Sequence, residues 1–215
     1  MPRLDAKRLT LNAKRGFSLI ELLIVISLFG IAASLITASY LGFERNQRVK
    51  SAASQLKNDL RLIQNNALSG GKGLSGACAS SSNLGGWYVS IEPGKNSYTV
   101  GGDCLVPLSG EVSFGAKSVN LPQDIKVNRI FYGTNPDVTY PVAILFRSLA
   151  NGVTFHDGRL AISPTLDFFE SNGTLKNYLI QPPQSAVIVE LSSLDGARKY
   201  QVKIELSGEI NEVKP

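Results

Sequence analysis

Few residues of this chain could carry out chemistry. Its 215 residues include one histidine, His156, and two cysteines, Cys78 and Cys104. A structural zinc site needs four ligands, so histidine and cysteine alone cannot form one here. The sequence also contains no GxSxG, Walker A, HExxH or CxxC pattern. These observations predict no metal, no cofactor and no catalytic residue, and they favour a protein that is not an enzyme.

The remaining catalytic candidates are weak. His156 directly precedes Asp157-Gly158, a turn signal, where a lone histidine is usually a solvated turn residue. The alternative is a general base working with Asp157 or Ser163. Asp167 and Glu170 could be paired glycosidase carboxylates, but such a pair is defined by its separation in space. Acidic residues are also common on strand surfaces.

A basic cluster near the C-terminus offers a binding alternative. It consists of Arg198, Lys199 and Lys203, and the two lysines fall on the polar face of an expected strand. The favoured interpretation is a solvated strand face, and the alternative is a small DNA-binding patch. The net charge is +5, but residues 1–16 hold five basic residues and one acid, which leaves a net charge of +1 for the rest. DNA binding would therefore be weak and salt-sensitive.

An apolar segment follows the basic leader and must position everything after it. Residues 17–43 contain a single charge, Glu21. A bilayer-spanning helix needs about 20 apolar residues, so the segment is long enough to span with some tilt. The positive charges before it predict a cytoplasmic N-terminus. An ordinary cleaved signal fits less well, because the small residues Ala32–Ser34 lie in the middle of the apolar run.

Glu21 is unusual in such a segment. A carboxylate inside lipid is costly and is usually functional, with a partner. The alternative is that Glu21 reaches the cytoplasmic headgroups, since it lies near that end of the segment.

The residues around Glu21 resemble a known motif. Lys14-Arg15-Gly16-Phe17-Ser18-Leu19-Ile20-Glu21 is similar to the prepilin processing motif of type IV pilins and pseudopilins. The resemblance implies that a prepilin peptidase cuts after Gly16, that Phe17 is N-methylated, and that Glu21 is the fifth mature residue. In that family this glutamate is thought to pair with the N-terminal amine of a neighbouring subunit. Major pilins often have proline where this chain has Ala38, so the resemblance is closer to a minor pilin or pseudopilin.

The helix is expected to continue beyond the membrane as an amphipathic segment, 44–69. Its apolar stripe has helical spacing and comprises Val49, Ala53, Leu56, Leu60, Ile63 and Ala67. Gly70-Gly71 should end it. We expect the stripe to pack on the chain's own sheet; a coiled-coil seam is the alternative, although the stripe is under three heptads long. The whole helix, from Phe17 to about Ser69, would be about 80 Å long.

The rest of the chain indicates a β domain. Residues 70–86 are rich in Gly and Ser and predict a flexible loop, and 87–215 predict an antiparallel β-rich domain. Expected strands lie at 87–92, 97–100, 125–132, 142–147, 186–191 and 200–206. Hairpin turns are expected at Asp157-Gly158, Asn172-Gly173 and Asp195-Gly196.

These elements predict an α+β fold with a lollipop shape, in which a long N-terminal helix packs on an antiparallel sheet. This is also the pilin arrangement. The strand and turn pattern of 87–213 loosely resembles the H-type minor pseudopilin and its competence-pilus relatives.

The two cysteines lie 26 residues apart and, on this topology, outside the membrane. An oxidising exterior favours a Cys78–Cys104 disulfide, which would stabilise the domain by about 3–4 kcal/mol in the chain-entropy model. Two free thiols are the alternative. No activating environment for a catalytic cysteine can be recognised.

The favoured function is a structural subunit of a type IV pilus, a type II secretion system or a related filament machine. The expected partners are the prepilin peptidase, other pilins and membrane lipid. The expected location is the inner (cytoplasmic) membrane, as a single pass with the β domain extracytoplasmic, and then the filament. One alternative is a DNA-binding minor pilin for DNA uptake. If mutating Arg198, Lys199 and Lys203 together caused loss of DNA retention, this alternative would be favoured. The other is a signal-anchored enzyme, for which Gly16→Ala and Glu21→Ala would leave function intact.

Overall fold

The computed structural model describes residues 16–72, 78, 83–106, 110–132, 137–147, 152–157, 168–169 and 186–214, without the side chains of residues 35, 36, 38 and 39. The chain divides into two compact units, Met1–Phe43 and Glu44–Pro215. The long helix α1 (Leu19–Leu68) contributes its first half to one unit and its second half to the other.

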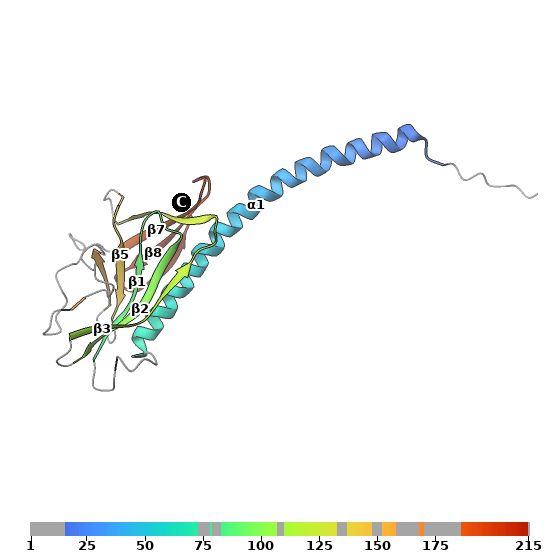
Figure 1. Cartoon of the computed structure of the whole chain (residues 1–215). Coiled ribbons are helices and arrows are strands. Elements are labelled where there is room, and N and C mark those ends of the chain that lie inside the picture. Colours follow the sequence, from blue (N-terminus) through green and yellow to red (C-terminus); the bar gives the residue numbers. More distant parts are fainter. Residues whose placement is uncertain are drawn as a thin grey trace, which may run out of the picture. The chain divides into compact units, whose positions relative to one another are not determined.

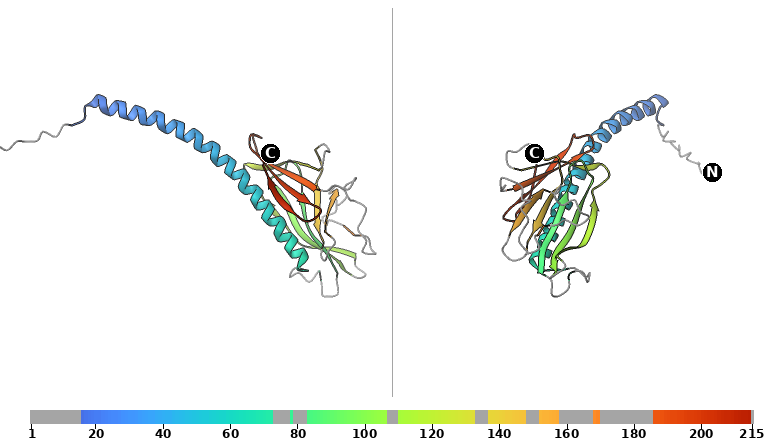
Figure 2. Two further views of the ribbon diagram at one scale, coloured as in Figure 1. Left: turned by 180° about the vertical axis from the view of Figure 1, so that it is seen from behind. Right: turned by 60° about the vertical axis from the view of Figure 1, so that its left-hand side comes forward.

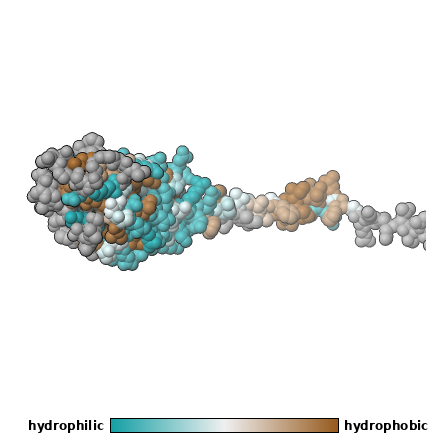
Figure 3. Space-filling view, turned by 90° about the horizontal axis from the view of Figure 1, so that it is seen from below, coloured by the Kyte–Doolittle hydropathy of each residue, from teal (hydrophilic) through white to brown (hydrophobic). Residues whose placement is uncertain are grey.

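In the first unit, α1 exposes apolar side chains around its whole circumference. These include Leu19, Ile20, Leu22, Leu23, Ile24, Val25, Ile26, Leu28, Phe29, Ile31, Tyr40, Leu41 and Phe43. Figure 3 shows the resulting apolar surface. No helix in the described part of the chain combines enough length with enough apolar character to cross a bilayer.

Three described hydroxyl groups of this segment bond to carbonyl groups of the same helix. Ser27 Oγ donates to the Leu23 carbonyl at 2.8 Å, and Thr37 Oγ1 donates to the Ala33 carbonyl at 2.8 Å. Ser34 Oγ donates to the Ile31 carbonyl, also at 2.8 Å. Because these donors are satisfied locally, the three polar residues do not interrupt the apolar surface.

The second unit contains two antiparallel sheets, shown from three directions in Figures 1 and 2. The strands are β1 Asn83–Ile91, β2 Ser97–Val106, β3 Gly110–Asn120, β4 Ile125–Phe131, β5 Val142–Phe146, β6 Val153–Asp157, β7 Ala186–Ser193, β8 Lys199–Glu205 and β9 Ile210–Val213. The larger sheet has the order β3-β2-β1-β5-β6, and the smaller has the order β4-β7-β8-β9. The six strands expected from the sequence correspond to β1, β2, β4, β5, β7 and β8, so the α+β prediction is confirmed, with two sheets in place of one.

The stripe on the second half of α1 packs on both sheets. All six residues of the predicted stripe are buried, from Val49 to Ala67, and they join one core with strands of each sheet. Side chains beside the stripe form hydrogen bonds between α1 and the strands. Tyr98 Oη donates to Asp59 Oδ2 at 2.5 Å, and Lys57 Nζ donates to Glu212 Oε1 at 2.8 Å. The stripe therefore packs against the chain's own sheets.

Glycines explain where the strands differ from the sequence expectation. β1 begins at Asn83, inside the segment expected as a loop, and β2 continues through Gly101 and Gly102. A Cβ at Gly86 would lie 2.5 Å from the Phe146 carbonyl oxygen, and one at Gly101 would lie 2.7 Å from Tyr88 Oη. These glycines allow close packing across strands, whereas the sequence suggested a flexible loop and a strand end.

β3 was not expected from the sequence. Its residues, GEVSFGAKSVN, alternate poorly, and most of its second half is exposed at the edge of the larger sheet. Antiparallel pairing with β2 holds it, from Ser97↔Asn120 to Val106↔Gly110. Such a strand is stabilised by its backbone ladder and leaves little side-chain signal in the sequence.

The turn predictions have different outcomes. Asp195-Gly196 does join β7 to β8, and Gly196 has the positive φ of 70° that favours glycine. The predicted Asp157-Gly158 hairpin lies only partly within the described residues, since β6 ends at Asp157. The Asn172-Gly173 turn lies outside them.

Candidate functional site

The processing motif lies at the start of α1. Gly16, Phe17 and Ser18 precede the helix and are exposed, and Glu21 lies in its first turn. Ser18 N donates to Glu21 Oε2 at 3.1 Å, while Glu21 N donates to Ser18 Oγ at 3.2 Å. This reciprocal pair is a capping box, which satisfies two backbone donors that the helix itself leaves unpaired.

The capping box also orients the Glu21 carboxylate. Ser18 Oγ donates to the same oxygen, Oε2, at 3.0 Å. No described group bonds Oε1 of Glu21, so one carboxylate oxygen is held and the other is available. Every atom of this arrangement lies after the Gly16–Phe17 bond, so cutting that bond would leave the arrangement intact.

Ser18 was not predicted to have a role of its own. Its signal in the sequence is the Ser-x-x-Glu spacing directly before an apolar run, which is the pattern of a capping box. From the sequence, Glu21 stood out as an intramembrane charge and as the fifth mature residue of the processing motif, and not as a capping residue.

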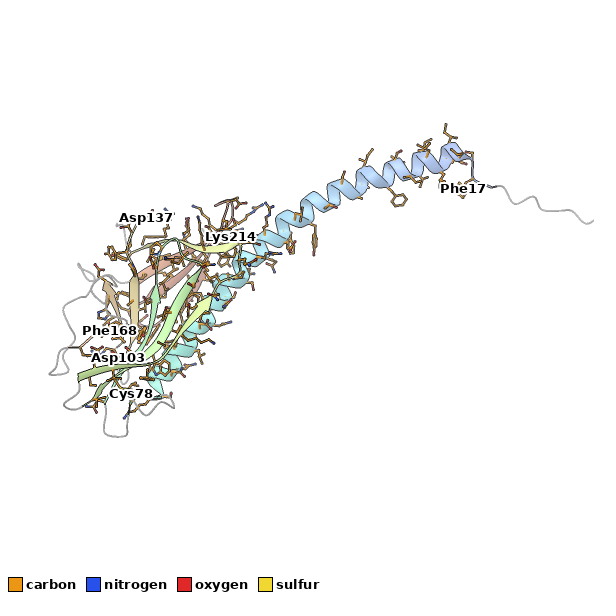
Figure 4. The ribbon with its side chains drawn as sticks, viewed as in Figure 1. Phe17, Cys78, Asp103, Asp137, Phe168 and Lys214 are labelled. Atoms are coloured by element: carbon orange, nitrogen blue, oxygen red, sulfur yellow. A yellow bond between two sulfur atoms is a disulfide. The ribbon has the colours of Figure 1, made fainter. Side chains whose placement is uncertain are left out.

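The predicted disulfide is present. Cys78 and Cys104 are bonded, with their Cα atoms 6.1 Å apart. Cys104 is buried in β2 beside Phe114 and Trp87. The bond holds Cys78, labelled in Figure 4, against the larger sheet.

The basic cluster lies on the smaller sheet, where two of its three members pair with carboxylates. Lys199 Nζ lies 3.3 Å from Glu190 Oε1, and Lys203 Nζ lies 2.6 Å from Glu205 Oε1. Arg198 is exposed in the turn before β8 and has no ion pair among the described residues. The positive charge available to an anionic ligand is therefore smaller than the sequence suggests.

Glu190 is the centre of this polar surface and was not singled out from the sequence. Its carboxylate is buried and accepts hydrogen bonds from Asn128 Nδ2 at 2.7 Å, Gln201 Nε2 at 2.9 Å and Arg129 Nε at 3.1 Å. Burial alone would raise the pKa of Glu190, but these donors and the Arg129 charge lower it to about 2. A lone glutamate in the run AVIVEL gives no sign of this network, because its donors come from other strands.

His156 differs from its expected place in a solvated turn. It lies in β6, 2% exposed, with Nε2 2.8 Å from Thr154 Oγ1, and its ring packs in a T-shaped arrangement with that of Phe168, with the ring centroids 5.0 Å apart. Figure 4 labels Phe168 on the same side of the domain as Asp103. The histidine is buried because Phe168 covers the outer face of the larger sheet there. Ser163, Asp167 and Glu170 lie outside the described residues.

We expect His156 to make the domain less stable below about pH 6. Burial, and then the positive charge of Arg147, lower the pKa of His156 from 6.5 to about 4. The unfolded state therefore binds the proton first, and stability falls as pH drops from 6.5 toward 4, by on the order of 3 kcal/mol. Urea unfolding across this pH range measures the loss. In His156→Gln, which cannot titrate, this part of the pH dependence should disappear; an unchanged profile would contradict the assignment.

Comparisons with known proteins find a recognised motif at the N-terminus. Residues 11–37 match the family model described as the prokaryotic N-terminal methylation motif, a region that includes Gly16, Phe17 and Glu21. Over 59 residues the chain is 42% identical to the Competence protein ComGD of Bacillus subtilis (strain 168). That match covers 27% of this chain and 41% of the relative, which is less than half of its length.

A solved structure is also similar to the chain. It is the minor pseudopilin EpsH from the Type 2 Secretion System of Vibrio cholerae, with a TM-score of 0.39 and 10% identity, over 78% of this chain and 98% of that one. This TM-score is too low to support a conclusion by itself. The comparisons therefore show the prokaryotic N-terminal methylation motif at residues 11–37, and the structure places that motif around the start of a helix whose second half packs on antiparallel sheets. Both features resemble those of type IV pilin-like proteins.

Proposed function

We propose that this chain is a structural subunit, a minor pilin or pseudopilin, of a type IV pilus, type II secretion system or related filament. The observation that carries this proposal is the methylation motif at residues 11–37, placed at the start of a helix with exposed apolar side chains. A prepilin peptidase would remove the leader, 1–16, by cutting after Gly16, and Phe17 would then be N-methylated.

The proposed topology is a single pass through the inner membrane. Residues 17–43 would lie in the bilayer, 44–69 would continue as the packed part of the helix, and 70–86 would connect to the domain at 87–215. The β domain would be extracytoplasmic, which is consistent with its disulfide. The membrane segment is proposed from the whole sequence of 17–43, including residues whose side chains are not described.

Glu21 would direct assembly. Cleavage creates a charged amine at Phe17, and a neighbouring subunit would bring its own amine close to the carboxylate. Ser18 already holds Oε2, so Oε1 can receive the amine without reorienting the side chain. An unpaired charge in lipid is penalised, so pairing between subunits would favour assembly and set the register of the helices.

The test is incorporation of a Glu21→Ala variant into filaments. We expect at least about a tenfold drop, the factor equivalent to 1.4 kcal/mol, because the partner amine loses its carboxylate. Immunoblots of sheared filaments and membranes, normalised to total protein, measure the ratio. Glu44→Ala is the matched control, because Glu44 is also a carboxylate on α1 but lies just beyond the apolar segment and pairs with Arg48 at 2.8 Å.

The control should assemble at nearly the normal level. Normal incorporation of Glu21→Ala would contradict the role given to Glu21. If both Gly16→Ala and Glu21→Ala left the protein's function intact, the signal-anchored enzyme would be the better explanation.

DNA binding during uptake is the second candidate. It is suggested by the competence role in the name of the Bacillus relative, and the share of that relative that is matched is small. Lys199 and Lys203 are each paired with a carboxylate, which leaves Arg198 as the member of the cluster without an ion pair among the described residues. DNA binding by this cluster therefore stays a prediction, less favoured than the structural role.

A further inference from the structure

Three segments meet at the end of the second unit where α1 enters it. The turn between β7 and β8 reaches α1, with Asp195 Oδ2 3.7 Å from Arg45 Nη1. The same turn reaches the segment before β4, because Leu194 N donates to the Asp124 carbonyl at 2.9 Å. Asp124 in turn pairs with Arg48 of α1 at 2.5 Å. We call this end, formed by 44–48, 124 and 194–198, the proximal rim.

The turn in the proximal rim is held by several hydrogen bonds of its own residues, and we call it the braced turn. Asp195 Oδ1 accepts hydrogen bonds from Ser193 Oγ at 2.5 Å and from Ala197 N at 3.0 Å. Arg198 N donates to Ser193 Oγ at 3.1 Å. These bonds hold the backbone of the turn from both sides, so the side chains between them keep a fixed place on the rim.

The braced turn exposes an unusual pair of side chains. Leu194 is 60% exposed, although an apolar side chain at a turn tip gains nothing from contact with water. Arg198 is exposed and has no ion pair in the described part of the chain. The other charges of the rim are two arginines and three carboxylates, a net charge of −1, since Arg45 faces Asp195 and Arg48 faces both Glu44 and Asp124. These charges are paired with one another, so Arg198 is the cation of the rim without an ion pair among the described residues.

The α1 part of the proximal rim, 44–48, follows the proposed membrane segment directly in the sequence. Arg45 is two residues after Phe43, the last residue of the apolar segment 17–43. It is five residues after Tyr40, an exposed aromatic of the kind that lies at membrane interfaces. Five helical residues span about 7–8 Å. Each headgroup layer is about 5–8 Å thick, so a membrane segment that ends near Tyr40 would leave the start of the rim within reach of the headgroups.

We propose that the proximal rim docks on the membrane surface while the subunit is still in the bilayer. Leu194 enters the headgroup layer toward the acyl chains, and Arg198 binds the phosphate of an anionic phospholipid. An exposed apolar side chain and, in the same turn, a guanidinium without an ion pair among the described residues fit such an interface, in which one side is apolar and the other charged. This inference rests on the proposed function, because it needs residues 17–43 in the bilayer.

The test places an environment-sensitive fluorophore at single introduced cysteines of the full chain. The chain is reconstituted in vesicles of phosphatidylethanolamine and phosphatidylglycerol, without reductant, so that Cys78 and Cys104 stay bonded and unlabelled. Leu194→Cys is the test site. Leu68→Cys is the matched control, because Leu68 is 59% exposed but lies at the far end of α1. Ile31→Cys reports insertion of the apolar segment itself.

We expect the probe at 194 to emit at shorter wavelength than the probe at 68. We also expect spin-labelled lipids to quench it several-fold more strongly. A probe at 194 that is as unquenched as the one at 68, while the probe at 31 is quenched, would overturn the docking proposal alone. An unquenched probe at 31 would overturn the membrane insertion on which the proposed function depends.

The role of Arg198 has its own test. Arg198→Gln, in the chain labelled at 194, should reduce quenching in vesicles that contain phosphatidylglycerol and have little effect in vesicles of phosphatidylcholine alone. Equal quenching with and without the Arg198→Gln substitution in the anionic vesicles would contradict the phosphate contact.

Discussion

Gly16→Ala is expected to leave the chain uncut when it is made together with a prepilin peptidase. The unchanged chain should instead be shortened to a form that begins with N-methyl-Phe17. Gly16 precedes the helix, and a Cβ at this position would meet no atom within 4 Å. Alanine therefore costs the fold almost nothing at this exposed position, by about 0.5 kcal/mol at most. A block in cleavage would report recognition by the peptidase, with no contribution from misfolding.

Gly30→Ala is the matched control for this experiment. Gly30 lies inside α1, and a Cβ there would also meet nothing within 4 Å. Alanine in place of glycine favours a helix interior by about 1 kcal/mol, so this variant should fold and be processed normally. Intact-mass and N-terminal analysis distinguish the products. A processed Gly16→Ala variant, or a wild-type product cut near Ala32–Ser34, would remove the basis for the role given to Glu21.

Leu60→Ala should destabilise the second unit by about 2–5 kcal/mol, the usual cost of a large cavity in a packed core. Leu60 is fully buried at the centre of the α1 stripe, where it belongs to the core shared by both sheets. The loss combines the transfer free energy of the deleted atoms with the cavity that rigid neighbours leave unfilled. The total is a large share of the stability of a domain of this size.

Leu62 provides the control, since it lies two residues further along the same helix and is 57% exposed. Leu62→Ala should change the free energy of unfolding by no more than about 0.5 kcal/mol. Urea unfolding of the full chain in detergent, followed by the fluorescence of Trp87, measures both variants. Equal effects of the two substitutions would contradict the packing of the stripe described above.

The N-terminal part of the protein could be predicted from sequence because its signals are local. A basic leader, then Gly16, Phe17 and Glu21 at fixed spacing, and a long apolar run can all be recognised without knowing any partner in space. The stripe on α1 is equally local, since helical geometry alone places Leu56 and Leu60 on one face. The Asp195-Gly196 hairpin depends on backbone preferences of its own two residues.

Tertiary structure decided the features whose partners lie far away in the chain. The sequence around Gly86 and Gly101 predicted a loop and a strand end. In the structure, the absence of a Cβ at these glycines lets Phe146 and Tyr88 of the neighbouring strands approach closely. His156 resembled a solvated turn residue, but Phe168 covers it.

The polar surface of the smaller sheet shows the same division. From the sequence, Lys199 could have been a cation available to a ligand. In the structure, it pairs with the buried Glu190 of the neighbouring strand β7. The physical reason is that burial and charge pairing depend on which strands become neighbours. That order is set when two sheets and one helix pack around a common core, and no local pattern in the sequence encodes it.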